Sequence, residues 1–255
     1  MSLSLILLFL GTAVLYASVG FGGGSTYTAL LILYGTDYRI LPTIALVCNI
    51  IVVSGGVWRF SKAGQINLKR LWPFLVTSIP AAWVGGQLPV SEIVFIGLLS
   101  SSLFISGLRL LFSRSYISPI VQQAVNTPIA VIIGAMLGLL SGIVGIGGGI
   151  FLAPILYFMK WGTSRQIAAA CSLFILLNSM SGLGGQVMKL NDLSLTMNAF
   201  GYWPLILSVF IGGQIGSWFG AIKFPQLWMK RITAILILYV SIRLLWRWMT
   251  MLTQL

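Results

Sequence analysis

The chain has 255 residues, of which 58% are hydrophobic and only 7% are charged, too little charge to cover a soluble globular protein of this size. Histidine is absent and only three residues are acidic, which argues against metal binding and against most acid–base or nucleophilic catalysis. We therefore expect an integral membrane protein in a lipid bilayer, not an enzyme, with no metal and no cofactor.

The net charge of +12 is the next feature. A basic chain can bind nucleic acid, but here Lys and Arg occur singly or in small groups between apolar stretches, so they indicate membrane topology and no nucleic-acid partner. Cys48 and Cys171 fall in the middle of predicted helices, where we expect small buried residues without a redox role.

Apolar stretches long enough to cross a bilayer follow one another along the chain. The first, residues 3–34, is interrupted by glycines and lacks a basic leading segment, so it is expected to be a retained segment. A second glycine-interrupted segment covers 127–159. Three further spans follow each of these two segments, at 42–58, 71–88 and 93–112, and then at 167–188, 199–222 and 227–246.

The chain also contains an internal duplication. The sequence VGFGGG at 19–24 recurs 125 residues later as VGIGGG at 144–149. A second match pairs Trp72, Pro73 and Gly85 with Trp203, Pro204 and Gly216 at a spacing of 131 residues. Because the two matches occur in the same order, they divide the chain into a first transmembrane repeat (1–112), a linker (113–126), a second repeat (127–248) and a C-terminal tail (249–255).

The distribution of charge favours one topology for the glycine-interrupted segments. If each turns back as a helical hairpin, eleven of the fifteen basic residues lie on one side and all three acids on the other; if each crosses once, the split is nine to six. The positive-inside rule prefers the hairpins. Each repeat then has a hairpin and three transmembrane helices, the fold is all-α, the repeats have inverted topology, and both termini lie outside. Arg243 and Arg247 fall at the outer end of the last helix, where we expect them to snorkel.

The duplicated glycine clusters are the candidate binding site. Glycine permits positive φ, so each cluster can end one half-helix and open another, whose N-terminal N–H groups favour an anion. Two such turns from inverted repeats would meet near the bilayer midplane. Close helix packing is the alternative. A soluble nucleotide-binding site is excluded because no βαβ unit surrounds the glycines.

Side-chain donors are expected from the span after each hairpin, with a register uncertain by two residues. An offset of 123 pairs Asn49 with Ser172, and an offset of 125 pairs Ser54 with Ser179. Thr26, Gln186 and Gln214 are further polar candidates. The candidate substrate-binding residues are Gly20, Gly22, Gly23, Gly24, Ser25, Asn49, Ser54, Gly145, Gly147, Gly148, Gly149, Ser172, Asn178 and Ser179.

At these residues the sequence resembles the TauE/SafE family of membrane permeases, the sulfite exporter family. The resemblance rests on the two glycine turns, on Pro154 after Gly149, and on the run from Ala168 to Phe174. It implies an inner-membrane transporter of sulfite, sulfonates or related small sulfur-containing or organic anions, usually an exporter. Ala29 stands where the first repeat would match Pro154, so the two half-sites are expected to be unequal.

The favoured function is therefore export of a small anion by alternating access. Because no acid or histidine is expected within the membrane, we expect export driven by the membrane potential, with Na⁺ coupling left open. An importer of a small anion or organic acid, and a membrane scaffold or assembly protein whose glycines serve packing, are the alternatives. Assembly into a homo-oligomer also stays open.

Overall fold

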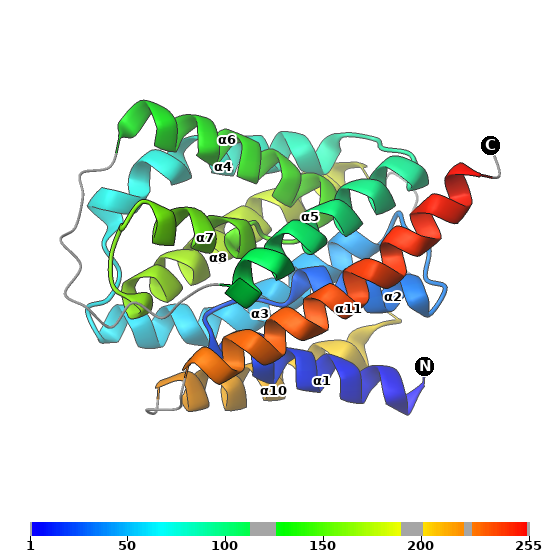
Figure 1. The fold of residues 1–255 in the computed structure, drawn as a ribbon, viewed down its shortest axis with the longest axis horizontal. Coiled ribbons are helices and arrows are strands. Elements are labelled where there is room, and N and C mark those ends of the chain that lie inside the picture. The colour runs from blue at the N-terminus through cyan, green and yellow to red at the C-terminus, as the bar shows by residue number, and fades with distance from the viewer. Residues whose placement is uncertain (1, 113–125, 190–200, 222–225, 254–255) are drawn as a thin grey trace.

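The structure, a computed structural model, describes residues 2–112, 126–189, 201–221 and 226–253. Within these ranges it is all-helical, as predicted, and contains no strand (Figure 1). The helices are α1 (Leu3–Ser18), α2 (Gly24–Leu33), α3 (Leu41–Lys62), α4 (Leu68–Gln87), α5 (Glu92–Phe112), α6 (Thr127–Val144), α7 (Gly149–Phe158), α8 (Ser164–Lys189), α10 (Trp203–Ala221) and α11 (Gln226–Leu252).

The helices agree with a multi-pass membrane protein. By length and composition, five stretches among the described residues can cross a bilayer: α3, α5, α6, α8 and Ala234–Leu252 of α11. The predicted spans 71–88 and 199–222 correspond to α4 and α10. The 20 residues of α4 give about 30 Å, the thickness of the hydrocarbon core, but Lys69, Arg70 and two prolines lower its hydropathy. Of α10, the stretch Trp203–Phe219 counts as a shorter apolar helix.

The first glycine-interrupted segment turns back on itself as a hairpin. Near its two ends, the hydroxyls of Ser4 on α1 and Tyr34 at the end of α2 lie 2.9 Å apart. Further in, the rings of Phe9 and Tyr27 stack with centroids 4.7 Å apart. Figure 1 shows that α6 and α7 also run in opposite directions. The single-crossing alternative is therefore wrong for the first segment.

Helices of the two halves pack against each other in a repeated pattern. Contacts join α1 to α10 and α4 to α6, which are the same pairing with the halves exchanged, and they also join α3 to α8 and α5 to α11. A Cβ on Gly85 would overlap the carbonyl oxygen of Leu139, and one on Gly216 would overlap that of Val14. Gly85 and Gly216 are 131 residues apart, and Leu139 and Val14 are 125 residues apart. These are the two repeat offsets, so the same glycine-to-carbonyl contact occurs twice, with the two halves exchanged.

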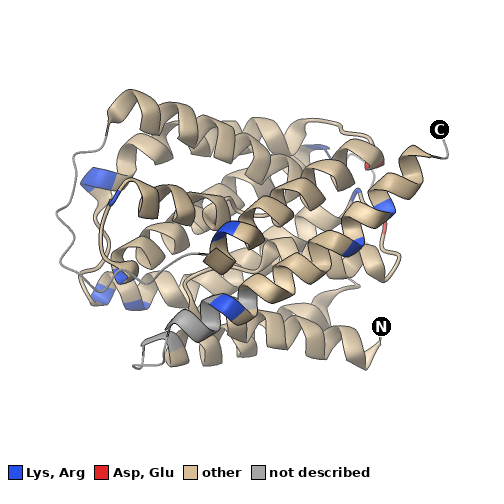
Figure 2. Ribbon diagram, in the orientation of Figure 1, with Lys and Arg blue, Asp and Glu red and all other residues tan. Residues whose placement is uncertain are grey.

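Charge separates the two ends of the bundle (Figure 2). We call the end where α3 and α7 finish and α4 and α8 begin the basic end. The opposite end, which we call the terminal end, carries N and C and the acidic segments (Figure 2). The basic end carries Arg59, Lys62, Lys69, Arg70, Lys160 and Arg165.

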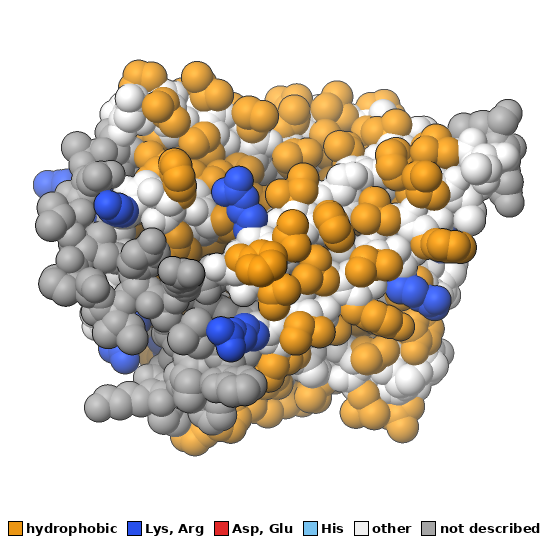
Figure 3. Space-filling view, in the orientation of Figure 1, with side chains coloured by type: hydrophobic (Ala, Val, Ile, Leu, Met, Phe, Trp, Pro, Cys, Tyr) orange, Lys and Arg blue, Asp and Glu red, His pale blue; other side chains and the backbone are white. Residues whose placement is uncertain are grey.

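The two arginines near the end of α11 differ in their contacts. Arg247 donates a hydrogen bond to the carbonyl of Ile32 at 3.0 Å and pairs with Glu92 at 3.4 Å, so it caps the last turn of α2. Arg243 is exposed. Apolar side chains spread over the visible face (Figure 3), and those of α11 include Ile235, at 60% exposure, and Trp246, at 76%, which is typical of a lipid-facing surface.

The repeated glycine contact generates a stability prediction. Gly85→Ala and Gly216→Ala should each destabilise the protein by about 1–3 kcal/mol, because the new methyl group overlaps a backbone carbonyl that cannot move away. Thermal unfolding in detergent measures the change. Gly11→Ala is the matched control, since nothing lies within 4 Å of its Cβ, and it should leave the midpoint unchanged or raise it. Equal midpoints for all three variants would contradict the close packing.

Candidate functional site

Both glycine clusters break the helices in which they lie. In the first break, between α1 and α2, Gly20 has φ 85° and Gly23 has φ 87°. In the second break, between α6 and α7, φ is 77° at Gly145, 80° at Gly147 and 75° at Gly148. These values lie in the left-handed region that other residues avoid. The glycine pattern therefore predicted the helix breaks correctly.

One buried side chain, Asn49 of α3, joins the two breaks. Its Oδ1 accepts a hydrogen bond from the backbone N–H of Gly24, the first residue of α2, at 2.8 Å. Its Nδ2 donates to the carbonyl of Gly145 in the second break at 3.5 Å. Asn49 is 0% exposed and fits only because Gly22 and Gly24 have no Cβ, which would lie 2.9 Å from Cγ in each case.

Ser172 of α8 makes the corresponding contact in the other direction. Its buried hydroxyl donates to the carbonyl of Gly20 in the first break at 2.8 Å. Asn49 and Ser172 are 123 residues apart, so each of these related positions bonds to a break in the opposite half. The contacts favour the offset of 123 for the side chains, although the glycines follow the offset of 125.

The second break is lined by buried hydroxyls that have no hydrogen-bond partner. Ser179 of α8 and Ser141 of α6 are both 0% exposed and their Oγ atoms are unpartnered. The Ser179 hydroxyl lies only 2.9 Å from the position that a Cβ on Gly147 would occupy. Asn178 donates to the carbonyl of Phe174 at 2.8 Å, while its Oδ1 is unpartnered. The two breaks are therefore unequal: Asn49 satisfies one, and unpaired hydroxyls surround the other.

The remaining candidate residues differ in how close they lie to the glycine breaks. Ser25 and Thr26 are buried in the first turn of α2, where Thr26 shares a hydrogen bond of 2.6 Å with Tyr16 across the hairpin. Ser54 does not join the set, because its side chain is exposed and donates to the carbonyl of Ile51 in its own helix. Gln186 instead donates to the carbonyl of Gly142 at 2.8 Å, in the contact between α8 and α6.

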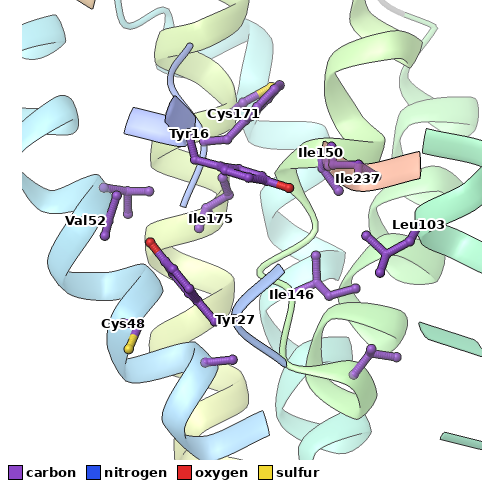
Figure 4. Close-up of a cluster of buried hydrophobic side chains, with 14 of the residues drawn as sticks. Tyr16, Tyr27, Cys48, Val52, Leu103, Ile146, Ile150, Cys171, Ile175 and Ile237 are labelled. Atoms are coloured by element: carbon purple, nitrogen blue, oxygen red, sulfur yellow. The ribbon is translucent and has the colours of Figure 1, made fainter. Parts of the chain in front are cut away.

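A cluster of buried apolar side chains surrounds the breaks. Figure 4 shows Tyr16 and Tyr27 of the first hairpin lying between Val52 of α3 and the second hairpin, represented by Ile146 and Ile150. Both cysteines are buried, as expected of small core residues. Polar groups in such surroundings cannot form hydrogen bonds with water, so a buried polar group without a partner destabilises the folded protein.

A cavity of about 140 Å³ leads from the basic end to the first break. Ser18, Val19 and Phe21 line it at the break, and Arg59 and Arg165 line it at the basic end. In the sequence, these two arginines indicate membrane topology and no binding site. Their sequence signal is that Arg59 directly follows the predicted span 42–58 and Arg165 lies just before the span 167–188, at the same predicted side of the membrane. Only the packing of α3 against α8 brings them to one cavity.

The bridge through Asn49 generates a prediction. Asn49→Leu should lower the free energy of unfolding by about 1–3 kcal/mol for each buried group left unpartnered, here the N–H of Gly24 and the carbonyl of Gly145. Ser54→Ala on the same helix is the control and should change it by less than about 0.5 kcal/mol. Thermal unfolding in detergent compares the two. A leucine variant as stable as the control would contradict the bridge.

Comparison with known proteins gives two matches that cover nearly the whole chain. The family described as sulfite exporter TauE/SafE matches residues 5–244. A curated relative, "Probable membrane transporter protein y4hK" of Sinorhizobium fredii (strain NBRC 101917 / NGR234), is 33% identical over 248 residues, covering 96% of this chain and 98% of its own length. No solved structure matches the chain. Both matches are to membrane transporters, so the expectation of a non-enzyme is confirmed, and the chain belongs to the TauE/SafE family.

Proposed function

We propose that this transporter exports a small anion by alternating access around the two glycine breaks. The observation that carries the proposal is the bridge through Asn49, which bonds to the N-terminus of α2 in one break and to a carbonyl in the other. A single buried side chain thus hydrogen-bonds to both glycine breaks. A substrate that enters between them must compete with this bridge, which couples binding to the relative position of the hairpins.

The chemistry of the breaks suits an anion. Gly24 presents a backbone N–H at the positive end of α2, and the neutral carbonyl of Asn49 accepts it now. An anion is a stronger acceptor than an amide oxygen, so it can replace Asn49 at this donor. The unpartnered hydroxyls of Ser141 and Ser179 offer two more donors at the second break. No Asp or Glu in the described part of the chain lies near either break.

The substrate class comes from the family, whose description names sulfite export. We propose sulfite, a sulfonate or a related small sulfur-containing or organic anion. With the basic end in the cytoplasm, the positive-inside rule places both termini outside an inner membrane. The cavity then opens to the cytoplasm, the side from which an exporter loads. The repeats at 1–112 and 127–248 are inverted with respect to each other in this proposal. Rocking of the hairpins would open the binding site first to one side of the membrane and then to the other.

Export of an anion needs no coupled ion. A cell interior that is negative drives one negative charge outward with about 2.3 kcal/mol per 100 mV. The two acids in the described ranges lie at the terminal end with basic partners. Arg39 hydrogen-bonds to Asp37 and holds the pKa of that carboxyl below its usual value, and Glu92 pairs with Arg247. Asp192 lies outside the described residues. Neither described acid is placed to carry a proton past the breaks.

The energetics predict how flux responds to potential. In proteoliposomes loaded with methanesulfonate, an inside-negative potential set with K⁺ and valinomycin should accelerate efflux, while a pH-sensitive dye should record no proton movement. Each 60 mV should favour exit by about tenfold in the equilibrium ratio for a single charge. Accumulation of the anion against this potential would support the importer, and proton movement driven by substrate would contradict uncoupled export.

The proposed role of the glycine breaks predicts that glycine-to-alanine changes there reduce transport. Gly23→Ala and Gly147→Ala should each reduce flux at least about tenfold, because alanine strains a residue of positive φ by roughly 1–2 kcal/mol and, at Gly147, crowds the Ser179 hydroxyl. Gly35→Ala is the matched control: its φ is 75°, but nothing lies within 4 Å of a Cβ there, so flux should persist.

Thermal unfolding of the same variants separates loss of function from loss of folding. The scaffold alternative predicts that variants which still fold behave like the wild type, and that no anion stabilises the protein. A folded Gly147→Ala variant with full flux would therefore contradict the proposed role of the second break.

A further inference from the structure

We propose that Arg59 and Arg165 form a loading site for a small oxyanion in the cavity at the basic end. The inference rests on the proposed function, and it adds a site outside the glycine breaks. The cavity is lined by both arginines and by the residues where α1 ends, including Ser18 and Val19. An anion held by the arginines is thus already in the compartment that reaches the first break.

The walls of the cavity carry positive charge without compensating negative charge. Arg59 and Arg165 are its charged lining residues, and no Asp or Glu is among the others. Its remaining polar side chains are neutral, and most of the rest of the wall is apolar, for example Phe60, Leu110 and Ile167. Two guanidinium groups in partly apolar surroundings attract a counter-anion more strongly than they would in open water.

The contacts of Arg59 fix its position without neutralising its charge. Its Nη1 donates to the carbonyl of Gln214 at 3.3 Å and to the hydroxyl of Ser217, and its Nη2 donates to Oε1 of Gln214 at 3.3 Å. Gln214 and Ser217 both lie on α10. These three acceptors are neutral, so the contacts hold the guanidinium beside the cavity while its full charge stays available to an anion.

Arg165 completes the site from the other half of the chain. It lies in the first turn of α8, it is exposed, and it forms no ion pair with any described residue. Arg59 lies on α3, in the first half. A site shared between α3 and α8 uses the same two helices that supply Asn49 and Ser172 to the breaks. Loading and binding are therefore connected through the same pair of helices.

The geometry selects a small oxyanion. The guanidinium group presents a planar fork of N–H donors that matches two oxygens of a sulfonate, sulfite or phosphate. The cavity, of about 140 Å³, is large enough for an anion of this size. A phospholipid headgroup has the same oxyanion chemistry, but its acyl chains would need an exit to the lipid, so we assign the site to a free anion.

Methanesulfonate serves as the test probe because it does not react with maleimides. In the cavity-lining variant Ala63→Cys, with Cys48 and Cys171 buried, N-ethylmaleimide should modify the new thiol, and methanesulfonate should slow this reaction. Adding Arg59→Gln or Arg165→Gln should raise the concentration for half-protection about tenfold or more. Arg59→Lys should restore part of the protection, since it keeps the charge but loses the fork.

Lys62→Gln is the matched control, because it removes one charge from the basic end at an exposed side chain that lies over the ring of Trp58. It should leave protection unchanged. Equal protection in the arginine variants, or protection only in the presence of added anionic lipid, would overturn the loading site. Wild-type-like methanesulfonate flux in the arginine variants would also overturn it while leaving the proposed function intact, whereas absence of flux in the wild-type chain would overturn the proposed function itself.

Discussion

The structure depends on how backbone groups are satisfied where two helices break inside an apolar protein. A continuous helix satisfies its own N–H and C=O groups, but each glycine break exposes donors and acceptors that hydrocarbon cannot solvate. Asn49 supplies an acceptor for the N–H of Gly24, and Ser172 supplies a donor for the carbonyl of Gly20. The breaks can exist only because α3 and α8 pass beside them and present polar side chains at the right level.

This requirement explains why the two halves are interlocked. Ser172 of the second half bonds to the first break, and Asn49 of the first half reaches the second break. The same exchange appears in packing, since α1 lies on α10 and α4 lies on α6. Neither half satisfies its own break completely. The repeats must therefore fold against each other, and a movement of one hairpin changes the hydrogen bonding of the other half.

The candidate site was partly predictable. Five of the seven described glycines at positive φ lie within the predicted clusters, because glycine tolerates that backbone region better than any other residue and the pattern occurs twice. Asn49, Ser172, Asn178 and Ser179 were also predicted, because a polar residue in an apolar span needs a partner. Ser54 is also a polar residue in an apolar span, but its hydroxyl bonds to its own helix and its side chain faces outward. Which face of α3 points toward the breaks depends on the rotation of the helix about its axis.

The sequence by itself determined the class of protein, the positions of the helix breaks and the family, because hydropathy and glycine conformation are local properties and the repetition can be seen without knowing the fold. The tertiary structure decided which side chain reaches which break. It also decided that Arg59 and Arg165 share one cavity and that Arg247 caps α2. Apart from the bond between Asn49 and Gly24, which are 25 positions apart, these contacts join residues about 100 to more than 200 positions apart. They follow from the packing of α3, α8, α10 and α11, which no local pattern specifies.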